Sequence, residues 1–406
     1  MAAKPLLPVS DALDAIKTSI TTLPAERIAI SKAHRRYTAD IHKARLSHPA
    51  SDVSAMDGYA VRSEDVVDLP TNLKVIDESA AGKPATAAVQ QGQAIRIFTG
   101  AVMPKGADCI ILQEDTIKQN SHITIAEASD AGKFIRKTGQ DFKAGDVLIP
   151  AGKQLTARDI ALLASADIDE VLTLPAPRVA IVNSGDELVE IGITPKHGQL
   201  VNSNGAMLAA MITAFGGEAV DLGSLPDKSG ALEHLLHANG AFDLIVTTGG
   251  ASVGEHDHII GDLQNHPQSK VNFWRIAMRP GKPLIFADWD GVPLLGLPGN
   301  PVSTGVCALL FVQAAIAKLQ GRHLQHDICS ARLSTPLPEN DKREDYIRTN
   351  LSVCDDRVLI ATPAGKQDSA MLSFFAKADG LIIRPPFAKA LGIGEEVQVI
   401  RFPTGF

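Results

Sequence analysis

Apolar side chains recur with a helical period at three places along the chain. Between residues 9 and 20 (VSDALDAIKTSI) they return every three or four positions, behind a Ser-Asp pair that can cap a helix. A second helix is expected from Pro24 to about Asp40, and the helical period returns at 156–174 (TARDIALLASADIDEVLTL). We therefore predict a helical connector formed by residues 1–43 and 145–175.

The segment between these helices has a different pattern. Short runs rich in β-branched residues (AIRIF, CIILQ, ITIAEA) are separated by glycine, proline and aspartate, which are typical of turns. This pattern predicts a β-rich insertion over 44–144.

Strands and helices alternate after a short linker bracketed by Pro175 and Pro177. Apolar runs such as RVAIVNS, FDLIVTT and VPLLGLP are separated by helical stretches such as NGAMLAAMITAF and SGALEHLLHA. This alternation predicts a three-layer α/β/α domain over 176–327, whose largely parallel sheet places ligands at the carboxyl ends of its strands. Residues 328–406 return to short strands and predict a C-terminal β-barrel.

Composition narrows the class of protein. The formal net charge of −7 argues against a dedicated nucleic-acid binder, because binding to nucleic acid depends on many contacts of Lys and Arg with phosphate. We find no stretch approaching the roughly 18 apolar residues of a membrane span, and no secretory signal pattern. The four cysteines, Cys109, Cys307, Cys329 and Cys354, are far apart and are expected to be reduced core thiols. A cytoplasmic protein without a membrane partner is expected.

Three loops that follow strands of the predicted sheet are unusually polar. They are NSGDE (183–187), TTGGASVGEHD (247–257) and GLPGNPVS (296–303). Gly249 and Gly250 allow a sharp turn and a close approach to a ligand, and Ser252 can cap the turn or donate to phosphate. In the third loop Asn300 can cap a helix that begins at Pro301, and Pro298 precedes them. These loops are candidate anion sites, although each also has a purely structural explanation.

Charged residues accompany the loops. Asp186, Glu187 and Asp257 offer the hard oxygen ligands that Mg²⁺ prefers, while each alone can also be a helix cap or a solvated loop residue. No His or Cys spacing supports a transition-metal site, and no nucleophile elbow supports a serine hydrolase. Three cations, Arg275, Arg279 and Lys282 in WRIAMRPGKP, favour a phosphorylated substrate over a merely solvated basic edge.

The β-rich insertion carries two further candidates. Asp57 lies between Met56 and Gly58 in SAMDGYAV, and Thr99 precedes Gly100 in FTGAVMP. Each can be a simple turn residue. Each gains a function if the insertion covers a substrate cleft of a partner chain.

Seven motifs in order resemble those of the MoeA family of molybdopterin molybdenumtransferases, which includes the E domain of gephyrin. They are SAMDGYAV, RIFTGAVMPKGAD, GDEL, VNSNG, TTGGASVGEHD, RPGKP and GLPGNPVS, and the likeness covers essentially the whole chain. The resemblance implies an elongated homodimer of four subdomains. Its active-site cleft is expected between the α/β domain of one subunit and the β-rich insertion of the other.

The resemblance also implies a reaction and its residues. The family inserts molybdate into adenylylated molybdopterin with Mg²⁺ and releases AMP, and contact with other molybdenum cofactor biosynthesis proteins is expected. Glu187 and Asp257 match acids of the family's site and are expected to be catalytic and to hold the metal, with Asp57 and Thr99 as further catalytic residues. Arg136, Asp141 and Ser369 match further polar positions of the family's site. The residues expected to bind substrate or phosphate are these three together with the loop residues and cations named above, namely Gly249, Gly250, Ser252, Arg275, Arg279, Lys282, Pro298, Asn300 and Pro301.

Several positions depart from the family pattern. Arg275 and Arg279 stand where many relatives carry lysine, which keeps the charge but presents a planar fork. Lys228 stands where relatives often carry a second aspartate, and Gln140 replaces a common glutamate. Two alternative functions remain, namely adenylylation of molybdopterin as in the MogA proteins and a scaffold without catalysis. The first has less support because Gly249-Gly250-Ala251-Ser252 departs from the TTGGTG of those proteins.

Overall fold

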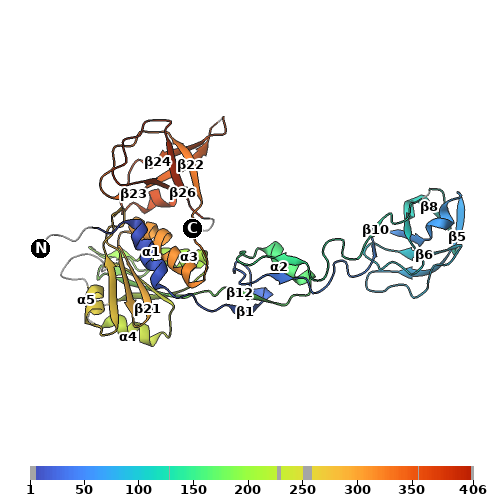
Figure 1. The fold of residues 1–406 in the computed structure, drawn as a ribbon, viewed down its shortest axis with the longest axis horizontal. Helices are drawn as coiled ribbons and strands as arrows, with labels where there is room; N and C mark the ends of the chain where they lie inside the picture. Colours follow the sequence, from blue (N-terminus) through green and yellow to red (C-terminus); the bar gives the residue numbers. More distant parts are fainter. Residues whose placement is uncertain (1–5, 128, 226–229, 250–257, 355, 404–406) are drawn as a thin grey trace. The chain divides into compact units, whose positions relative to one another are not determined.

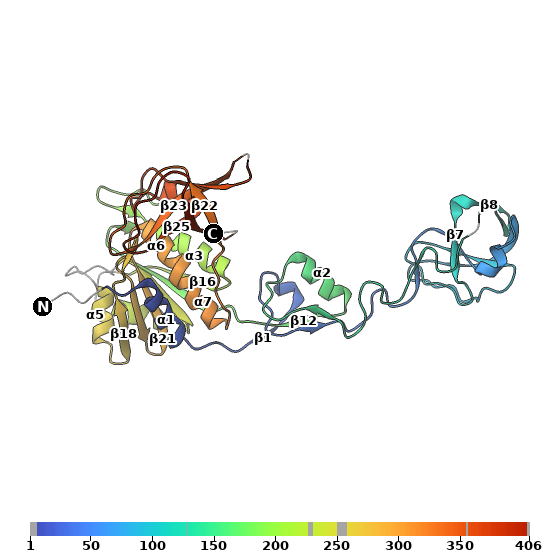
Figure 2. The same cartoon turned by 45° about the horizontal axis from the view of Figure 1, so that its top comes forward.

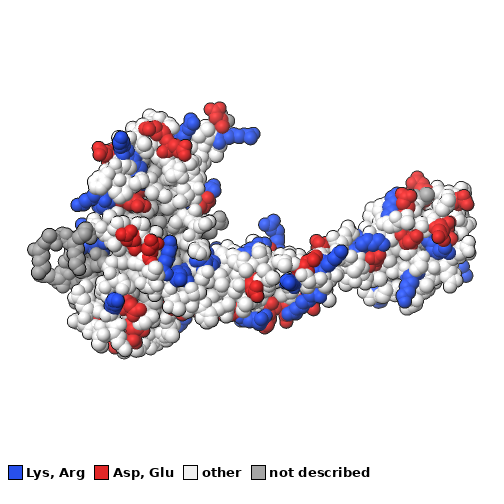
Figure 3. All heavy atoms as spheres, in the orientation of Figure 1, with Lys and Arg blue, Asp and Glu red and all other residues white. Residues whose placement is uncertain are grey.

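The computed structural model describes residues 6–127, 129–225, 230–249, 258–354 and 356–403. The contacts divide the chain into two compact units, one comprising Met1–Ala25 with Leu174–Phe406 and the other Glu26–Thr173. On the face shown in Figure 3, acidic and basic side chains are interspersed on both units.

A six-stranded sheet forms the centre of the α/β domain in the first unit (Figure 1). Its strands, in spatial order, are β16 (Glu218–Leu225), β13 (Arg178–Ser184), β17 (Leu244–Thr248), β21 (Val292–Leu297), β20 (Ile285–Trp289) and β18 (Ser269–Trp274). The first four run parallel, and the last two are antiparallel to their neighbours. The sheet is therefore largely parallel, as the sequence predicted.

Helices cover both faces of this sheet (Figures 1 and 2). One face packs against α1 (Val9–Ser19), α3 (Ser203–Phe215), α6 (Pro301–Cys307) and α7 (Gln313–Leu319), with the π-helical turn η4 (Ala308–Val312) joining the last two. The other face packs against α4 (Ala231–Ala238) and α5 (His258–Asn265). Successive β13 residues alternate between the faces, with Ile181 in the first core and Val182 in the second. The predicted three-layer α/β/α class is confirmed.

The helical stretch Pro301–Leu319 corrects one expectation from the sequence. It has 19 residues, and by its length and composition alone this helical stretch could cross a membrane. However, 89% of its most apolar window is buried inside the protein. Its hydrophobicity is explained by its place in the core between the sheet and the barrel, where residues such as Val306, Leu309 and Phe311 are fully buried.

A closed β-barrel follows at the C-terminal end of the first unit. Its strands are β22 (Ile328–Leu333), β23 (Glu344–Val353), β24 (Leu359–Pro363), β25 (Gly380–Arg384) and β26 (Glu396–Arg401). The ring closes because β23 pairs with both β24 and β25. The short strand β19 (Met278–Arg279) extends from the α/β domain and pairs in parallel with the start of β23. The single turn α8 (Leu372–Ala376) packs against α6.

The second unit contains another six-stranded sheet. In spatial order its strands are β7 (Cys109–Leu112), β4 (Gly58–Val61), β6 (Gln93–Ile97), β5 (Thr71–Ser79), β9 (His122–Ile125) and β8 (Thr116–Gln119). Two-stranded pairs complete the unit: β3 (Val53–Ser54) with β10 (Ile135–Arg136), β2 (His42–Lys43) with β11 (Val147–Ile149), and β1 (Glu26–Ala29) with β12 (Glu170–Thr173). The β-rich character expected for 44–144 is present.

Two expected helices differ from the structure. The helix expected from Pro24 to Asp40 is not formed, because β1 pairs with β12 and a short 3₁₀ turn, η1 (Ile30–Lys32), follows it. Ile28 and Ile30 thereby pack against a core shared with α2 (Ala157–Ser165). The latter helix begins with a capping box in which Thr156 and Asp159 exchange hydrogen bonds, and it ends well before residue 174. Strand pairing across about 140 residues outweighs the local helical period here.

Candidate functional site

The described residues Ser184, Gly249 and Gly299, one from each of the three polar loops, meet at the carboxyl ends of the parallel strands of the α/β domain. Gly249 follows β17 with a φ of +76°, and a Cβ atom there would lie 2.1 Å from the carbonyl oxygen of Ser184 at the end of β13. A Cβ atom on Gly299, in the third loop, would lie 3.5 Å from the Cα atom of Gly249. The backbones approach so closely that only glycine fits at Gly249 without a shift of the neighbouring strand.

Side-chain hydrogen bonds hold these loops in place. Asn204, near the start of α3, donates from Nδ2 to the Gly299 carbonyl at 2.8 Å and is 9% exposed. The Thr248 hydroxyl donates to Oδ1 of the buried Asn183 at 3.0 Å, which ties β17 to β13. The Thr304 hydroxyl donates to the Pro298 carbonyl at 2.6 Å. These hydrogen bonds join the edge of the sheet to α3, β13 and α6.

The structure brings Asn300 and Ser369 together, although they are far apart in sequence. Asn300 donates from Nδ2 to the Ser369 hydroxyl at 2.9 Å, and the N–H of Val302 donates to the Ser369 carbonyl at 3.0 Å. Ser369 therefore extends the polar edge of the α/β domain with a hydroxyl from the barrel region. Pro301 begins α6 as predicted, whereas the side chain of Asn300 contacts Ser369 and makes no capping hydrogen bond.

The predicted metal ligands are placed only in part. Asp186 and Glu187 are exposed just beyond β13, and the Glu187 carboxylate lies over Gly185, where a Cβ atom would approach one of its oxygens to 2.6 Å. Asp257 lies outside the described residues, as do Gly250, Ser252 and Lys228. Within the described ranges, no group of three or more His, Cys, Asp or Glu residues could hold a metal ion. The pairing of Glu187 with Asp257 stays a prediction.

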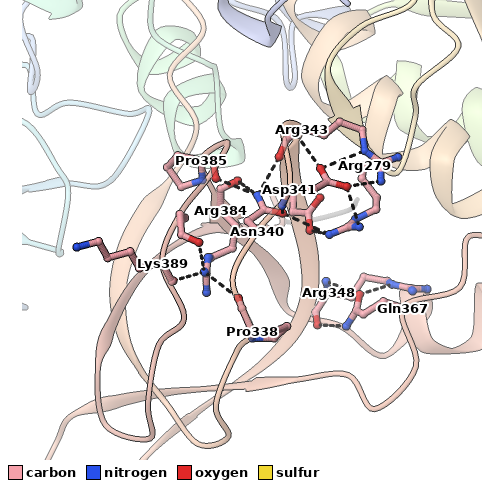
Figure 4. A network of polar contacts seen from close by, with 12 residues as sticks. Arg279, Pro338, Asn340, Asp341, Arg343, Arg348, Gln367, Arg384, Pro385 and Lys389 are labelled. Carbon is pink, nitrogen blue, oxygen red and sulfur yellow. Dashed lines mark hydrogen bonds and ion pairs between the residues drawn. The ribbon is translucent and has the colours of Figure 1, made fainter.

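The three predicted cations have different surroundings. Lys282 is exposed, and the N–H of Arg275, a residue with a φ of +83°, donates to the Leu284 carbonyl at 3.1 Å. Arg279 contacts the barrel, where it forms an ion pair with Asp345 and donates to Oδ1 of Asn340 at 3.3 Å (Figure 4). The basic edge was expected either to be solvated or to face phosphate. At Arg279 it is part of an ion-pair network.

A hollow of about 450 Å³ lies beside this network and is lined by three arginines. Arg279 contributes from β19, Arg348 from β23 and Arg384 from β25 (Figure 4). Arg348 is only 1% exposed, and it donates to Oε1 of Gln367 at 3.2 Å and to the Lys366 carbonyl at 3.2 Å. It thereby supports the loop that carries Ser369.

Arg348 and Arg384 were missed by the sequence analysis. Arg384 is 2% exposed and donates from Nη2 to three backbone carbonyls, but its Nε and Nη1 atoms have no hydrogen-bond partner. The signal available in the sequence was an arginine in the middle of an apolar strand, YIRTNL and LIIRPP. Buried arginines require partners, so such positions indicate a polar network or a ligand.

The acids of the network differ in their electrostatics. Arg343 donates to Asp341 at 2.7 Å, and this contact is the largest cause that lowers the Asp341 pKa to about 2. Burial raises the pKa of Asp345 above its ordinary value, and the ion pair with Arg279 opposes this effect. Burial therefore disfavours the ionised form of Asp345, and the positive charge of Arg279 compensates for this effect.

In the second unit the two predicted residues of the β-rich insertion form a direct pair. Oδ1 of Asp57 accepts hydrogen bonds from both the backbone N–H and the hydroxyl of Thr99, each at 2.7 Å. The N–H of Thr99 is the largest cause that lowers the Asp57 pKa, followed by its hydroxyl, while the charge of Arg96 contributes least. Asp57 is therefore a half-buried, ionised carboxylate in a fixed orientation.

Arg136 and Asp141 lie in the same region of the insertion. Both line a hollow of about 580 Å³, together with Gly100, Gln140 and His48. The N–H of Gly100 donates to the Ser54 carbonyl at 2.8 Å, and β10 pairs Arg136 with Val53. The structure thus gathers Thr99, Arg136 and Asp141 near one hollow, with Asp57 bonded to Thr99. Gln140 accepts from the N–H of Lys137 at 3.1 Å, so its amide closes a turn.

These features define a multidomain α/β protein with a glycine-lined polar site at the carboxyl edge of a parallel sheet and a second polar site in its β-rich unit. Three family models match the chain in order. Residues 7–166 match the MoeA N-terminal region (domain I and II), 180–318 match a probable molybdopterin binding domain, and 330–402 match the MoeA C-terminal region (domain IV). The chain belongs to the MoeA family, which confirms the resemblance inferred from its motifs.

Known relatives match along nearly the whole chain. The molybdopterin molybdenumtransferase of Nostoc sp. is 36% identical over 388 residues, covering 93% of this chain and 89% of the relative. The enzyme of the same name from Haemophilus influenzae is 35% identical over 381 residues, covering 93% and 94%. The crystal structure of the molybdopterin biosynthesis MoeA protein from Pyrococcus horikoshii has a TM-score of 0.81 at 30% identity, covering 98% of this chain and 100% of that chain.

Proposed function

We propose that this protein is a molybdopterin molybdenumtransferase, which inserts molybdate into adenylylated molybdopterin and releases AMP. The observation that carries the proposal is the meeting of Ser184, Gly249 and Gly299, from the three polar loops, at the carboxyl edge of the sheet, in a chain that matches enzymes of this name over nearly its full length. Exposed backbone N–H groups and nearby cations at such an edge suit the phosphates of an adenylylated pterin.

The residues have separate tasks in this proposal. Gly249 gives the substrate access to the backbone, while Asn300 and Ser369 present polar groups beside it. Lys282 is exposed and supplies positive charge for the anionic substrates, while part of the charge of Arg279 is compensated by its ion pair with Asp345. Release of AMP breaks a phosphoanhydride P–O bond by attack of water, and the negative charge that develops on the phosphate oxygens needs stabilisation.

A divalent cation fits the acids at this edge. Asp186 and Glu187 are exposed oxygen donors directly beyond β13, which suits Mg²⁺ because it binds through one or two carboxylates plus substrate phosphates. Glu187 and Asp257 would hold it. When bound, Mg²⁺ supplies charge neutralisation at the phosphates.

The proposal includes a homodimer with two shared sites. The candidate residues fall into two groups, one at the edge of the α/β domain and one around Asp57 and Thr99 in the second unit. We propose that the insertion of one subunit completes the site of the other. Mixing two inactive variants, Asp57→Asn and Glu187→Gln, under conditions that allow subunit exchange should then restore activity at one of the two sites. Absence of any recovery in verified mixed dimers would contradict the shared site.

The activity itself is tested with purified protein, adenylylated molybdopterin, molybdate and Mg²⁺. AMP release is followed by chromatography, and the product is measured by its ability to activate an apo-molybdoenzyme. Glu187→Gln and Asp257→Ala should abolish turnover, whereas Glu233→Gln, an exposed acid on α4, is the matched control. No turnover above a protein-free sample would refute the proposal. Consumption of ATP with bare molybdopterin would support adenylylation instead, and inactivity towards both substrates would support a scaffold.

We further propose a cytoplasmic location. The four cysteines are free, which suits a reducing compartment. The expectation of core thiols holds for Cys109 and Cys307, which are buried. Cys329 is half-buried, and Cys354 is exposed, so for these two the expectation was wrong.

A further inference from the structure

We propose that Arg96 is a positioning residue that holds the Asp57–Thr99 pair in its productive geometry. Its effect on catalysis rests on the proposed function. Its effect on the pair itself does not, and it can be measured in the absence of substrate. The sequence analysis did not single out Arg96, which lies in the run AIRIF of the β-rich insertion.

The guanidinium of Arg96 contacts two aromatic rings. Its Cζ atom is 5.0 Å from the centroid of the Tyr59 ring and 4.8 Å from that of Phe98. Arg96 is half-buried, and Tyr59 is only 4% exposed. Two such contacts restrict a long side chain that would otherwise sample many rotamers.

The edge of the guanidinium binds two segments next to Asp57. Nη1 donates to the carbonyl of Gly58, the next residue, at 3.2 Å, and Nη2 donates to Oε1 of Gln113 at 2.5 Å. Gln113 in turn donates from its backbone N–H to the Asp57 carbonyl at 3.3 Å. Arg96 therefore holds the backbone that follows Asp57, directly at Gly58 and through Gln113 at the Asp57 carbonyl.

Arg96 also contacts Phe98, the residue that precedes the other partner of the pair. Strand β6 ends at Ile97, and Phe98 then leads to Thr99, so the ring that stacks on Arg96 adjoins the residue that donates to Asp57. Strand β4 pairs with β6, so Tyr59 lies opposite Arg96 in the register. One side chain thus links the segment that carries Asp57, the turn that carries Gln113 and the segment that carries Thr99.

The charge of Arg96 acts in the same direction as its geometry. It stabilises the ionised form of Asp57 and helps to lower the pKa of that carboxyl group, after the two hydrogen bonds from Thr99. Charged groups on the neighbouring elements are Glu78, the register partner of Arg96 on β5, and Glu114, which accepts from Nε2 of Gln113 at 3.1 Å.

Two substitutions separate charge from geometry. Arg96→Lys keeps the positive charge but cannot bind Gly58 and Gln113 with one planar fork. Arg96→Gln removes the charge as well. Arg178→Gln is the matched control, because Arg178 also stacks on an aromatic ring, Phe242 at 4.8 Å, and donates to backbone carbonyls, but lies in the other unit.

The direct readout is the titration of Asp57 in the full-length protein. Threonine residues labelled with ¹³C in the γ2 methyl group report on it, because the hydroxyl of Thr99 donates to the titrating carboxylate. The Thr99 signal is assigned by its loss in Thr99→Val, and Asp57→Asn should remove its pH dependence. We expect Arg96→Gln to move the midpoint of this titration upward, towards the ordinary value of an aspartate, whereas Arg178→Gln leaves it unchanged.

The kinetic readout follows AMP release. We expect Arg96→Gln to lower kcat by about 10- to 100-fold, the loss typical of a misplaced catalytic group. Arg96→Lys should lower kcat less than Arg96→Gln does, and it should keep the midpoint of the Thr99 titration closer to that of the wild type. A wild-type midpoint and wild-type kcat in Arg96→Gln would overturn the inference, and so would a loss equal to that of Arg178→Gln. If the wild type shows no AMP release, the proposed function fails, while the midpoints still decide the role of Arg96.

Discussion

Gly249→Ala tests whether the close approach of the loops at the sheet edge is required. The residue has a φ of +76°, and its Cβ atom would lie 2.1 Å from the carbonyl oxygen of Ser184 and 3.2 Å from the carbonyl carbon. The positive φ costs about 1–2 kcal/mol for an alanine. Relief of the overlap requires a backbone shift at the end of β13, which adds about 1–3 kcal/mol.

A matched control isolates the second contribution. Gly291, in the turn between β20 and β21 of the same sheet, has a φ of +83°, but its Cβ position has no atom within 4 Å. Gly291→Ala should therefore lower the free energy of unfolding only by the cost of the positive φ, about 1–2 kcal/mol. Gly249→Ala should lower it by roughly 1–3 kcal/mol more than this control.

Urea unfolding measures the difference, with the transition of the α/β domain followed by circular dichroism and the slope compared among the variants. Gly249→Ala should also release AMP more slowly, because the loop can no longer approach Ser184. Equal midpoints for the two variants, together with normal AMP release by Gly249→Ala, would refute the close contact and its functional role.

Three further predictions follow from particular contacts. A double-mutant cycle of Asn300→Ala and Ser369→Ala should give a coupling of about 0.5–1 kcal/mol in unfolding experiments, and additive effects would exclude their hydrogen bond. Because its folded pKa is depressed to about 2, Asp341 should stabilise the fold above its ordinary pKa of about 4, and this stabilisation should be lost as the pH falls from about 4 to 2. The loss, below about 1 kcal/mol for this exposed group, should be absent in Asp341→Asn. Cys354 should react with a thiol reagent in the folded protein, whereas Cys307, whose pKa is raised by burial, should react only after unfolding.

The sequence was sufficient to predict elements whose local pattern agrees with their surroundings. The runs around β13 and β17 are continuous and apolar because both faces of the sheet are covered, and this predicts a parallel sheet before any contact is known. The segment 24–40 was misjudged because its apolar positions suit a helix, whereas β1 is fixed by pairing with the distant strand β12. Pairing of that kind has no local signal.

The candidate site was predictable to a similar degree. Glycine doublets and a polar loop after a strand indicated the position of Gly249, and the structure supplies the reason in the carbonyl of Ser184. The bond between Asp57 and Thr99 spans 42 residues and depends on the pairing of β4 with β6, so spacing could not predict it. Arg348 and Arg384 were overlooked because an arginine within a strand resembles an outward-facing polar residue, whereas both are buried.

The most direct test of the central claim is the stoichiometry of a single turnover. Enzyme in excess over adenylylated molybdopterin is mixed with molybdate and Mg²⁺, and AMP and molybdenum-loaded cofactor are quantified in the same samples. We expect both products to form together in equal amounts and Glu187→Gln to yield neither. AMP formed without loaded cofactor in the presence of saturating molybdate, or no AMP at all, would contradict this expectation.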